Sequence, residues 1–130
     1  MGLFKKELVL DGIKNFEQLI EKFVSYLESE NYKVQTKIEG DKAVIQAQKG
    51  GILRDLIAAE RALTFTFERQ SEDKVKVTVG VGKWIQNLAV TALETIFLSE
   101  IFLFIDIPEM LWNSHIEGQI INKLKQLAAE

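Results

Sequence analysis

The chain contains no cysteine, and this absence excludes several kinds of chemistry at once. Disulfide bonds, thiol nucleophiles and thiolate metal sites all require cysteine. A chain without cysteine also suits a reducing compartment. The first residues, MGLFKKELVLDG, carry two lysines but lack the long apolar stretch of a secretory signal. We therefore expect a cytoplasmic protein.

Histidine is almost as scarce, since His115 is the only one. A catalytic histidine would need a nucleophile and an orienting acid, and a metal would need two or three further ligands. The sequence GVGKW, at 80–84, has glycines and a lysine but not the full spacing of a phosphate-binding loop. We predict no catalytic residue, no metal and no cofactor, and hence no enzymatic activity.

Basic residues are missing from one long stretch of the chain. No lysine or arginine occurs from Trp84 to Asn122, although the chain has 16 elsewhere, and its net charge is −3. Proteins that bind nucleic acids neutralise phosphates with clustered lysines and arginines. We therefore expect no nucleic-acid partner.

The 130 residues fit a single domain, 1–130, that is long enough to bury a core. The first clear element is an amphipathic helix at 13–29, and we expect Asp11 or Asn15 to cap its start. Its apolar residues recur at helical spacing. They are Phe16, Leu19, Ile20, Phe23, Val24 and Leu27.

Between residues 31 and 82 the apolar period changes to two, which is typical of strands. Four segments show this alternation: 31–40, 42–48, 62–69 and 74–82. Gly40-Asp41 is expected to form a tight turn, and 52–60 either a short helix or a packed loop. We predict a four-stranded antiparallel sheet with helices on one face, and a polar opposite face of lysine, glutamine and threonine.

A second amphipathic helix is predicted at 115–128. Ser114 and Glu117 have the spacing of a capping box, in which each side chain satisfies a backbone donor of the other. The expected fold is therefore α+β: an N-terminal helix, a four-stranded antiparallel sheet, and C-terminal helices packed on one face of the sheet.

The most unusual stretch is the apolar segment from Trp84 to Trp112. Up to Leu98 its polar residues gather on one side, which predicts an amphipathic helix at 84–98 on the sheet. Beyond Leu98 the polar side disappears, and residues 101–105 are all apolar. Glu94 and Glu100 would each cost about 2.5–3.5 kcal/mol near the centre of a bilayer, which argues against a transmembrane span.

A helix that is apolar all round must be buried or covered by a partner. Three roles remain possible for this stretch: additional core beneath a bent helix, an interface between copies of the chain, or a surface for an apolar ligand or lipid. The residues of such an interface or ligand surface would be Trp84, Phe97, Glu100, Ile101, Phe102, Phe104 and Trp112.

Several motifs occur in a defined order over residues 49–112. They are KGGILRDLIAAERALTFTF at 49–67, a strand ending in VGVGKW at 79–84, the apolar segment, and IPEMLW at 107–112. In this order they resemble a family of small uncharacterised bacterial α+β domains. That family has a glycine-containing loop, a strand ending in Gly-x-Gly-Lys/Glu-Trp, an apolar segment and a Pro-Glu-x-hydrophobic-Trp piece. The resemblance implies no known activity, and no catalytic residues carry over.

Two functions follow as hypotheses. The first is a non-catalytic interaction domain that self-associates, as a homodimer, through residues 96–112. The alternative is a binder of an apolar ligand or lipid through the Trp84–Trp112 segment.

Overall fold

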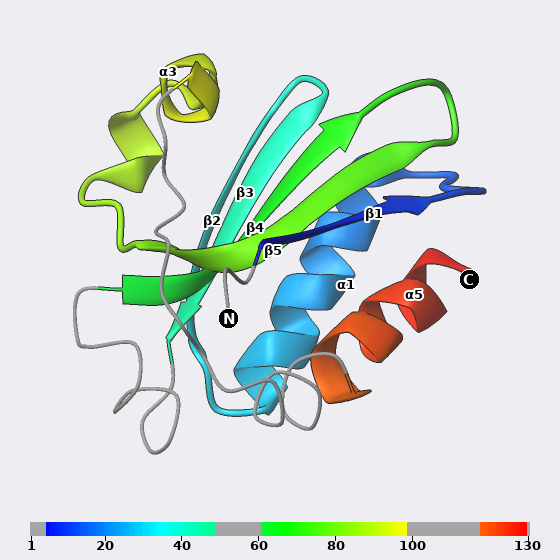
Figure 1. The fold of residues 1–130 in the computed structure, drawn as a ribbon, viewed down its shortest axis with the longest axis horizontal. Helices are drawn as coiled ribbons and strands as arrows, with labels where there is room; N and C mark the ends of the chain where they lie inside the picture. Colours follow the sequence, from blue (N-terminus) through cyan, green and yellow to red (C-terminus); the bar gives the residue numbers. More distant parts are fainter. Residues whose placement is uncertain (1–4, 49–60, 99–117, 130) are drawn as a thin grey trace.

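A computed structural model describes residues 5–48, 61–98 and 118–129 of the chain (Figure 1). Its elements, in chain order, are β1 (Lys5–Leu10), α1 (Phe16–Ser29), β2 (Lys33–Glu39), β3 (Lys42–Gln48), β4 (Arg61–Arg69), β5 (Val75–Lys83), the 3-10 helix η1 (Leu88–Val90), α3 (Leu93–Leu98) and α5 (Asn122–Ala128). The strands form one antiparallel sheet in the order β1-β5-β4-β3-β2. The predicted α+β class and antiparallel sheet are confirmed.

The sheet has five strands in the described residues, so the prediction of four was wrong. The missed strand is β1, which pairs with β5 in a register running from Lys5 opposite Gly80 to Leu10 opposite Val75. Charged residues occupy the first half of β1 and hide its alternation, which shows only over its last residues. Leu10 is buried there and Val9 is 55% exposed.

Helix α1 begins at Phe16 because Asn15 caps it. The backbone of Asn15 is extended, with φ −141°, and its side-chain oxygen accepts the Gln18 N–H at 2.9 Å. This bond satisfies one of the backbone donors that a helix N-terminus leaves without a partner. Asn15 is thus the cap, of the two candidates, and the helix starts three residues later than predicted.

The main core lies between one face of the sheet and helices α1 and α5. Phe23 is fully buried, and its ring meets that of Phe65 edge-on at 5.0 Å between centroids. The other large, fully buried side chains of this core are Phe67, Ile20, Leu27, Ile45, Leu63, Ile120, Ile121 and Leu124. The two periodicities seen in the sequence, helical at 16–27 and alternating in the strands, therefore meet in one core.

The opposite face of the sheet is also covered, which contradicts the prediction of helices on one face only. In Figure 1, η1 and α3 lie on the other side of the sheet from α1 and α5. Both elements contact β2, and α3 also contacts β3. The sheet is therefore the middle layer of the described structure.

The structure describes only part of the predicted C-terminal helix and none of the predicted segment that precedes β4. The C-terminal helix α5 covers Asn122–Ala128, while the expected capping box at Ser114 and Glu117 lies outside the described residues. The predicted helix or loop at 52–60 also lies outside them. The tight turn at Gly40-Asp41 is confirmed, with Gly40 at φ +58°, a value that glycine adopts without strain.

Removing the central ring of the main core should destabilise the fold strongly. Phe23→Ala should lower the free energy of unfolding by about 3–5 kcal/mol, because the lost burial and the cavity add. Urea denaturation at 25 °C measures this loss. Phe23→Leu is the matched control, expected to cost less, and equal losses in the two variants would contradict the packing described.

Candidate functional site

The described half of the apolar segment crosses the sheet face opposite α1. It leaves the end of β5 at Lys83, passes through η1 and continues into α3. The single helix predicted at 84–98 is therefore wrong, because the chain turns at Asn87, whose φ is +60°, and extends again at Thr91, with ψ 128°. Asn87 belongs to the few residue types that adopt this left-handed conformation readily.

A small apolar cluster lies beneath this segment, separate from the main core. Its buried members are Val44, Leu88, Leu93 and Ile96, with Ile85 and Phe97 packed beside them. Val44 comes from β3, and the other members come from the segment itself. Among the described residues, few apolar contacts hold the segment to the sheet, and polar contacts add to them.

The first polar attachment is the fully buried side-chain amide of Gln46 on β3. Its Oε1 accepts the backbone N–H of Ile85 at 2.9 Å and the Nε2–H of Gln35 at 2.8 Å. Its Nε2 donates to the Lys83 carbonyl at 2.7 Å and to the Thr64 hydroxyl at 3.1 Å. The amide therefore uses both its acceptor and its donor atoms to hold the chain as it leaves β5.

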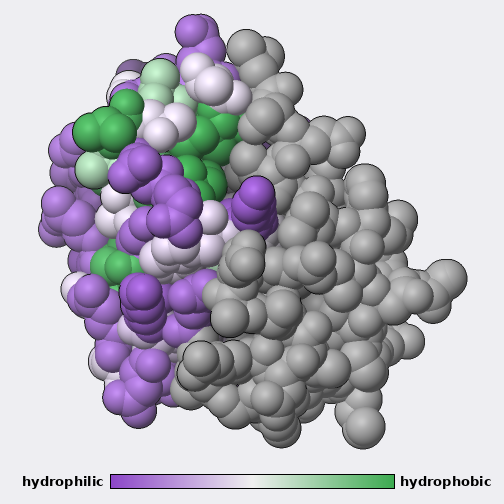
Figure 2. Space-filling view, turned by 90° about the vertical axis from the view of Figure 1, so that its left-hand side faces the viewer, coloured by the Kyte–Doolittle hydropathy of each residue, from purple (hydrophilic) through white to green (hydrophobic). Residues whose placement is uncertain are grey.

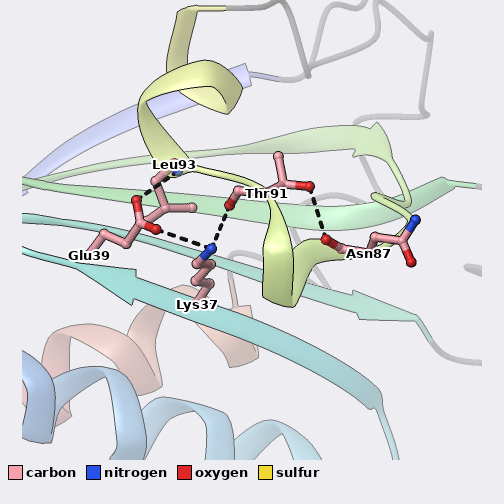
Figure 3. Close-up of polar contacts among 5 residues, drawn as sticks. All are labelled: Lys37, Glu39, Asn87, Thr91 and Leu93. Carbon is pink, nitrogen blue, oxygen red and sulfur yellow. Dashed lines mark hydrogen bonds and ion pairs between the residues drawn. The ribbon is translucent and has the colours of Figure 1, made fainter.

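The second attachment is an ion pair on β2, drawn in Figure 3. Glu39 accepts the backbone N–H of Leu93 at 2.9 Å and pairs with the Lys37 ammonium at 3.1 Å. Lys37 donates to the Thr91 carbonyl at 2.7 Å. The carboxylate thus serves as a cap for the start of α3, a role that a sequence-adjacent residue usually fills.

The environment of Glu39 favours its charged form. The backbone hydrogen bond from Leu93, followed by the hydrogen bond from Lys37, holds the pKa of the Glu39 carboxyl below its ordinary value of 4.5. Both partners stabilise negative charge, and at neutral pH the carboxylate is therefore ionised.

Aromatic residues near both ends of the described half of the segment, 84–98, lie beneath lysine ammonium groups. Lys33 Nζ is 5.1 Å from the centroid of Trp84, and Lys42 Nζ is 5.6 Å from that of Phe97. Both distances suit a cation–π contact. Trp84 and Phe97 are half-buried, so these two predicted surface residues keep part of their rings accessible.

An apolar patch lies on the surface over this segment. Figure 2 shows hydrophobic residues gathered in the upper part of the face, at the level of η1 and α3, among hydrophilic ones. Val90 in η1 is 82% exposed. The other predicted surface residues, which are Glu100, Ile101, Phe102, Phe104 and Trp112, lie outside the described residues.

Sequence reasoning found the apolar segment but missed the polar contacts that hold it. The face that carries Gln46 was predicted to be polar and left uncovered, yet Gln46 and Thr64 are fully buried. Glutamine and threonine in a strand ordinarily indicate a solvated face. No pattern in the sequence indicates that backbone groups near Lys83 and Ile85 would bond to them.

A shallow groove of about 530 Å³ lies elsewhere, between α1 and α5. It is lined by Tyr26, Lys123 and Leu127 among others, and Lys123 Nζ lies 5.6 Å from the Tyr26 ring. Burial, and then the charge of Glu30, raise the pKa of the Tyr26 hydroxyl above its ordinary value of 10.0. The groove is lined by both apolar and polar side chains of α1 and α5, and none of its lining residues belongs to the apolar segment.

Two kinds of site are not found in the part of the chain that the structure describes. Residues 5–48, 61–98 and 118–129 contain no group of three or more acids or histidines placed to hold a metal ion. Within the same ranges, no helix has both the length and the apolar character needed to cross a membrane.

Comparison of the chain with protein-family models, with curated proteins and with solved structures found no match. The resemblance to a family of bacterial domains over residues 49–112 therefore stays a prediction, and the site has to be interpreted from its own contacts.

Acid should release the cap of α3. Because the pKa of Glu39 is lowered in the folded chain, the stabilisation by its carboxylate is complete above pH 4.5 and is lost as the pH falls through the lowered value. The Leu93 amide resonance in NMR should titrate with a midpoint below 4.5. In Glu39→Gln this titration should disappear, and a wild-type midpoint at or above 4.5 would contradict the contact.

Replacing the buried amide should also destabilise the fold. Gln46→Leu leaves the Ile85 N–H and the Lys83 carbonyl without this partner, at a cost of about 1–3 kcal/mol in the free energy of unfolding. Gln35→Leu is the comparison, because Gln35 is only half-buried, whereas Gln46 is fully buried, and its loss should cost less. Urea denaturation compares the two, and an unchanged stability of Gln46→Leu would show that the amide carries no such role.

Proposed function

We propose that the chain is a non-catalytic interaction domain that self-associates through residues 96–112. The observation that carries this proposal is the separation of the two apolar clusters. The main core is formed by α1, α5 and one sheet face, whereas the segment that leads into residues 96–112 lies on the opposite face. The apolar run thus starts from a part of the molecule that the main core does not include.

The start of the run supports this reading. Ile96 is buried against the sheet, Phe97 is half-buried, and Val90 nearby in sequence is 82% exposed. Residues 101–105 then add five apolar side chains in a row, IFLFI. We propose that a second copy of the chain covers this apolar run, because exposed apolar patches mark interaction sites and a second copy supplies a surface of the same composition.

The alternative function is binding of an apolar ligand or lipid through the Trp84–Trp112 segment. The half-buried ring of Trp84 beneath Lys33 favours it, because the accessible part of this ring offers an apolar contact to a ligand. The two functions differ in what accompanies the chain. Self-association predicts a doubled mass without added material, and ligand binding predicts a single chain that carries extra mass.

The complete absence of cysteine supports a place for this domain in a reducing compartment, which we propose to be the cytoplasm. The interaction domain would then meet its second copy at cellular concentrations.

A charge placed in the run should prevent self-association. Phe102→Glu and Phe104→Glu should convert a dimer into a monomer, because a carboxylate cannot be buried unpaired in an apolar interface. Native mass spectrometry without detergent, with sedimentation velocity over a range of concentrations, measures this. Val9→Glu is the control, since Val9 is exposed on β1. A wild-type monomer carrying additional mass would favour the ligand-binding alternative, and a clean monomer would exclude both.

A further inference from the structure

Strand β2 is an outer strand of the sheet, and β3 is its only strand neighbour in the described residues. The two-residue turn Gly40-Asp41 makes Glu39 and Lys42 a pair that exchanges hydrogen bonds. Such pairs alternate along an antiparallel ladder. Every second residue, counted back from Glu39, therefore bonds to β3.

The intervening residues, Val34, Thr36 and Ile38, direct their backbone N–H and C=O groups away from β3. Among the described residues these groups have no strand partner, and they form the outer edge of β2, which lies in front in Figure 3, with η1 and α3 above it and α1 below. A free edge of this kind is a template for another strand. Its side chains determine which strand fits.

The geometry points to β2 of a second copy as that strand. We propose that two β2 strands pair antiparallel, with Thr36 opposite Thr36, and join two sheets into one. This inference rests on the proposed self-association and adds a second surface to it. In this register Lys33 faces Glu39 and Gln35 faces Lys37, each twice by symmetry, and Val34 faces Ile38.

The charged side chains of β2 favour this register over its neighbours. A shift by two residues in one direction places Lys37 opposite Lys37, and a shift in the other places Lys33 opposite Lys37. Like charges directly opposite each other destabilise a strand pair, whereas opposite charges stabilise it. Lys33, Thr36 and Glu39 are all exposed and can be reached by a partner.

The lysines of β2 do not protect its edge in the usual way. Edge lysines ordinarily discourage pairing by extending into solvent beside the strand. Here Lys37 is directed to Glu39 and Thr91, and Lys33 lies over the ring of Trp84. Both ammonium groups therefore lie over the covered sheet face, and neither extends beside the backbone edge of β2.

The other outer strand, β1, lacks this self-complementarity. Two copies of β1 that pair antiparallel about its middle residues place either Glu7 opposite Glu7, or Leu8 opposite Leu8 with Glu7 opposite Val9. The carboxylate of Glu7 then faces a like charge or an apolar side chain. β2 is therefore the edge at which a second copy fits, and the exposed Val90 in η1, which contacts β2, adds apolar surface beside it.

The first test removes one outward N–H from β2. Thr36→Pro should raise the dimer dissociation constant at least about tenfold, since symmetry removes two hydrogen bonds at once. Proline at an outward-facing edge position leaves the β3 ladder intact. Thr36→Val is the matched control, because both variants lose the 2.9 Å bond from the Thr36 hydroxyl to the Val44 carbonyl. Sedimentation velocity measures both, and equal weakening in the two would overturn the proposal.

The second test uses the wild-type chain and does not depend on the folding of a variant. Amide hydrogen exchange followed by NMR should slow with rising protein concentration at Val34, Thr36 and Ile38. Exchange at Gln35 and Lys37, which bond to β3, should not change. Concentration-independent exchange at all five residues would overturn the proposal.

The two tests separate this inference from the proposed function. A dimer lost in Phe102→Glu but kept in Thr36→Pro overturns β2 pairing alone. A dimer lost in Thr36→Pro but kept in Phe102→Glu and Phe104→Glu supports β2 pairing and overturns the interface at 96–112. A wild-type chain that is monomeric at every concentration overturns both.

Discussion

The elements that cover the second face of the sheet are held in place by the buried side-chain amide of Gln46. An amide enclosed there without partners would cost more than most single contacts contribute, so its donors and acceptor must be satisfied together. The Lys83 carbonyl and the Ile85 N–H do this, along with two side chains. The point at which the chain leaves β5 is thereby fixed, and the position of η1 and α3 follows from it.

Most of the main core could be predicted from the sequence because its residues follow two simple periods. Helix α1 and strands β2 to β5 were found where apolar side chains recur at helical or alternating spacing, as at Phe23 and Phe65. Strand β1 was missed because its lysines and Glu7 interrupt that spacing. Its place in the sheet is determined by pairing with β5, a contact between residues far apart in the chain.

The candidate site was less predictable for the same reason. The helical spacing at 84–98 is compatible with a single helix, but the left-handed backbone of Asn87 and the cap supplied by Glu39 divide it. Glu39 lies 54 residues before Leu93, so no local pattern links them. A prediction based on period alone identifies which segment is apolar and does not identify what holds it in place.

Strand β2 serves two purposes, and they do not compete. The side chains of Lys37 and Glu39 point to the covered face, where their hydrogen bonds hold the start of α3. Each such bond contributes little net stability, but together they set the position of the helix. The backbone groups of Thr36 and its alternate neighbours point outward instead. Because side chains and backbone edge are perpendicular in a strand, one strand can anchor the apolar segment and still offer its edge to a second copy. Pairing of two β2 strands would bring the apolar segments of the two copies onto the same face of one continuous sheet.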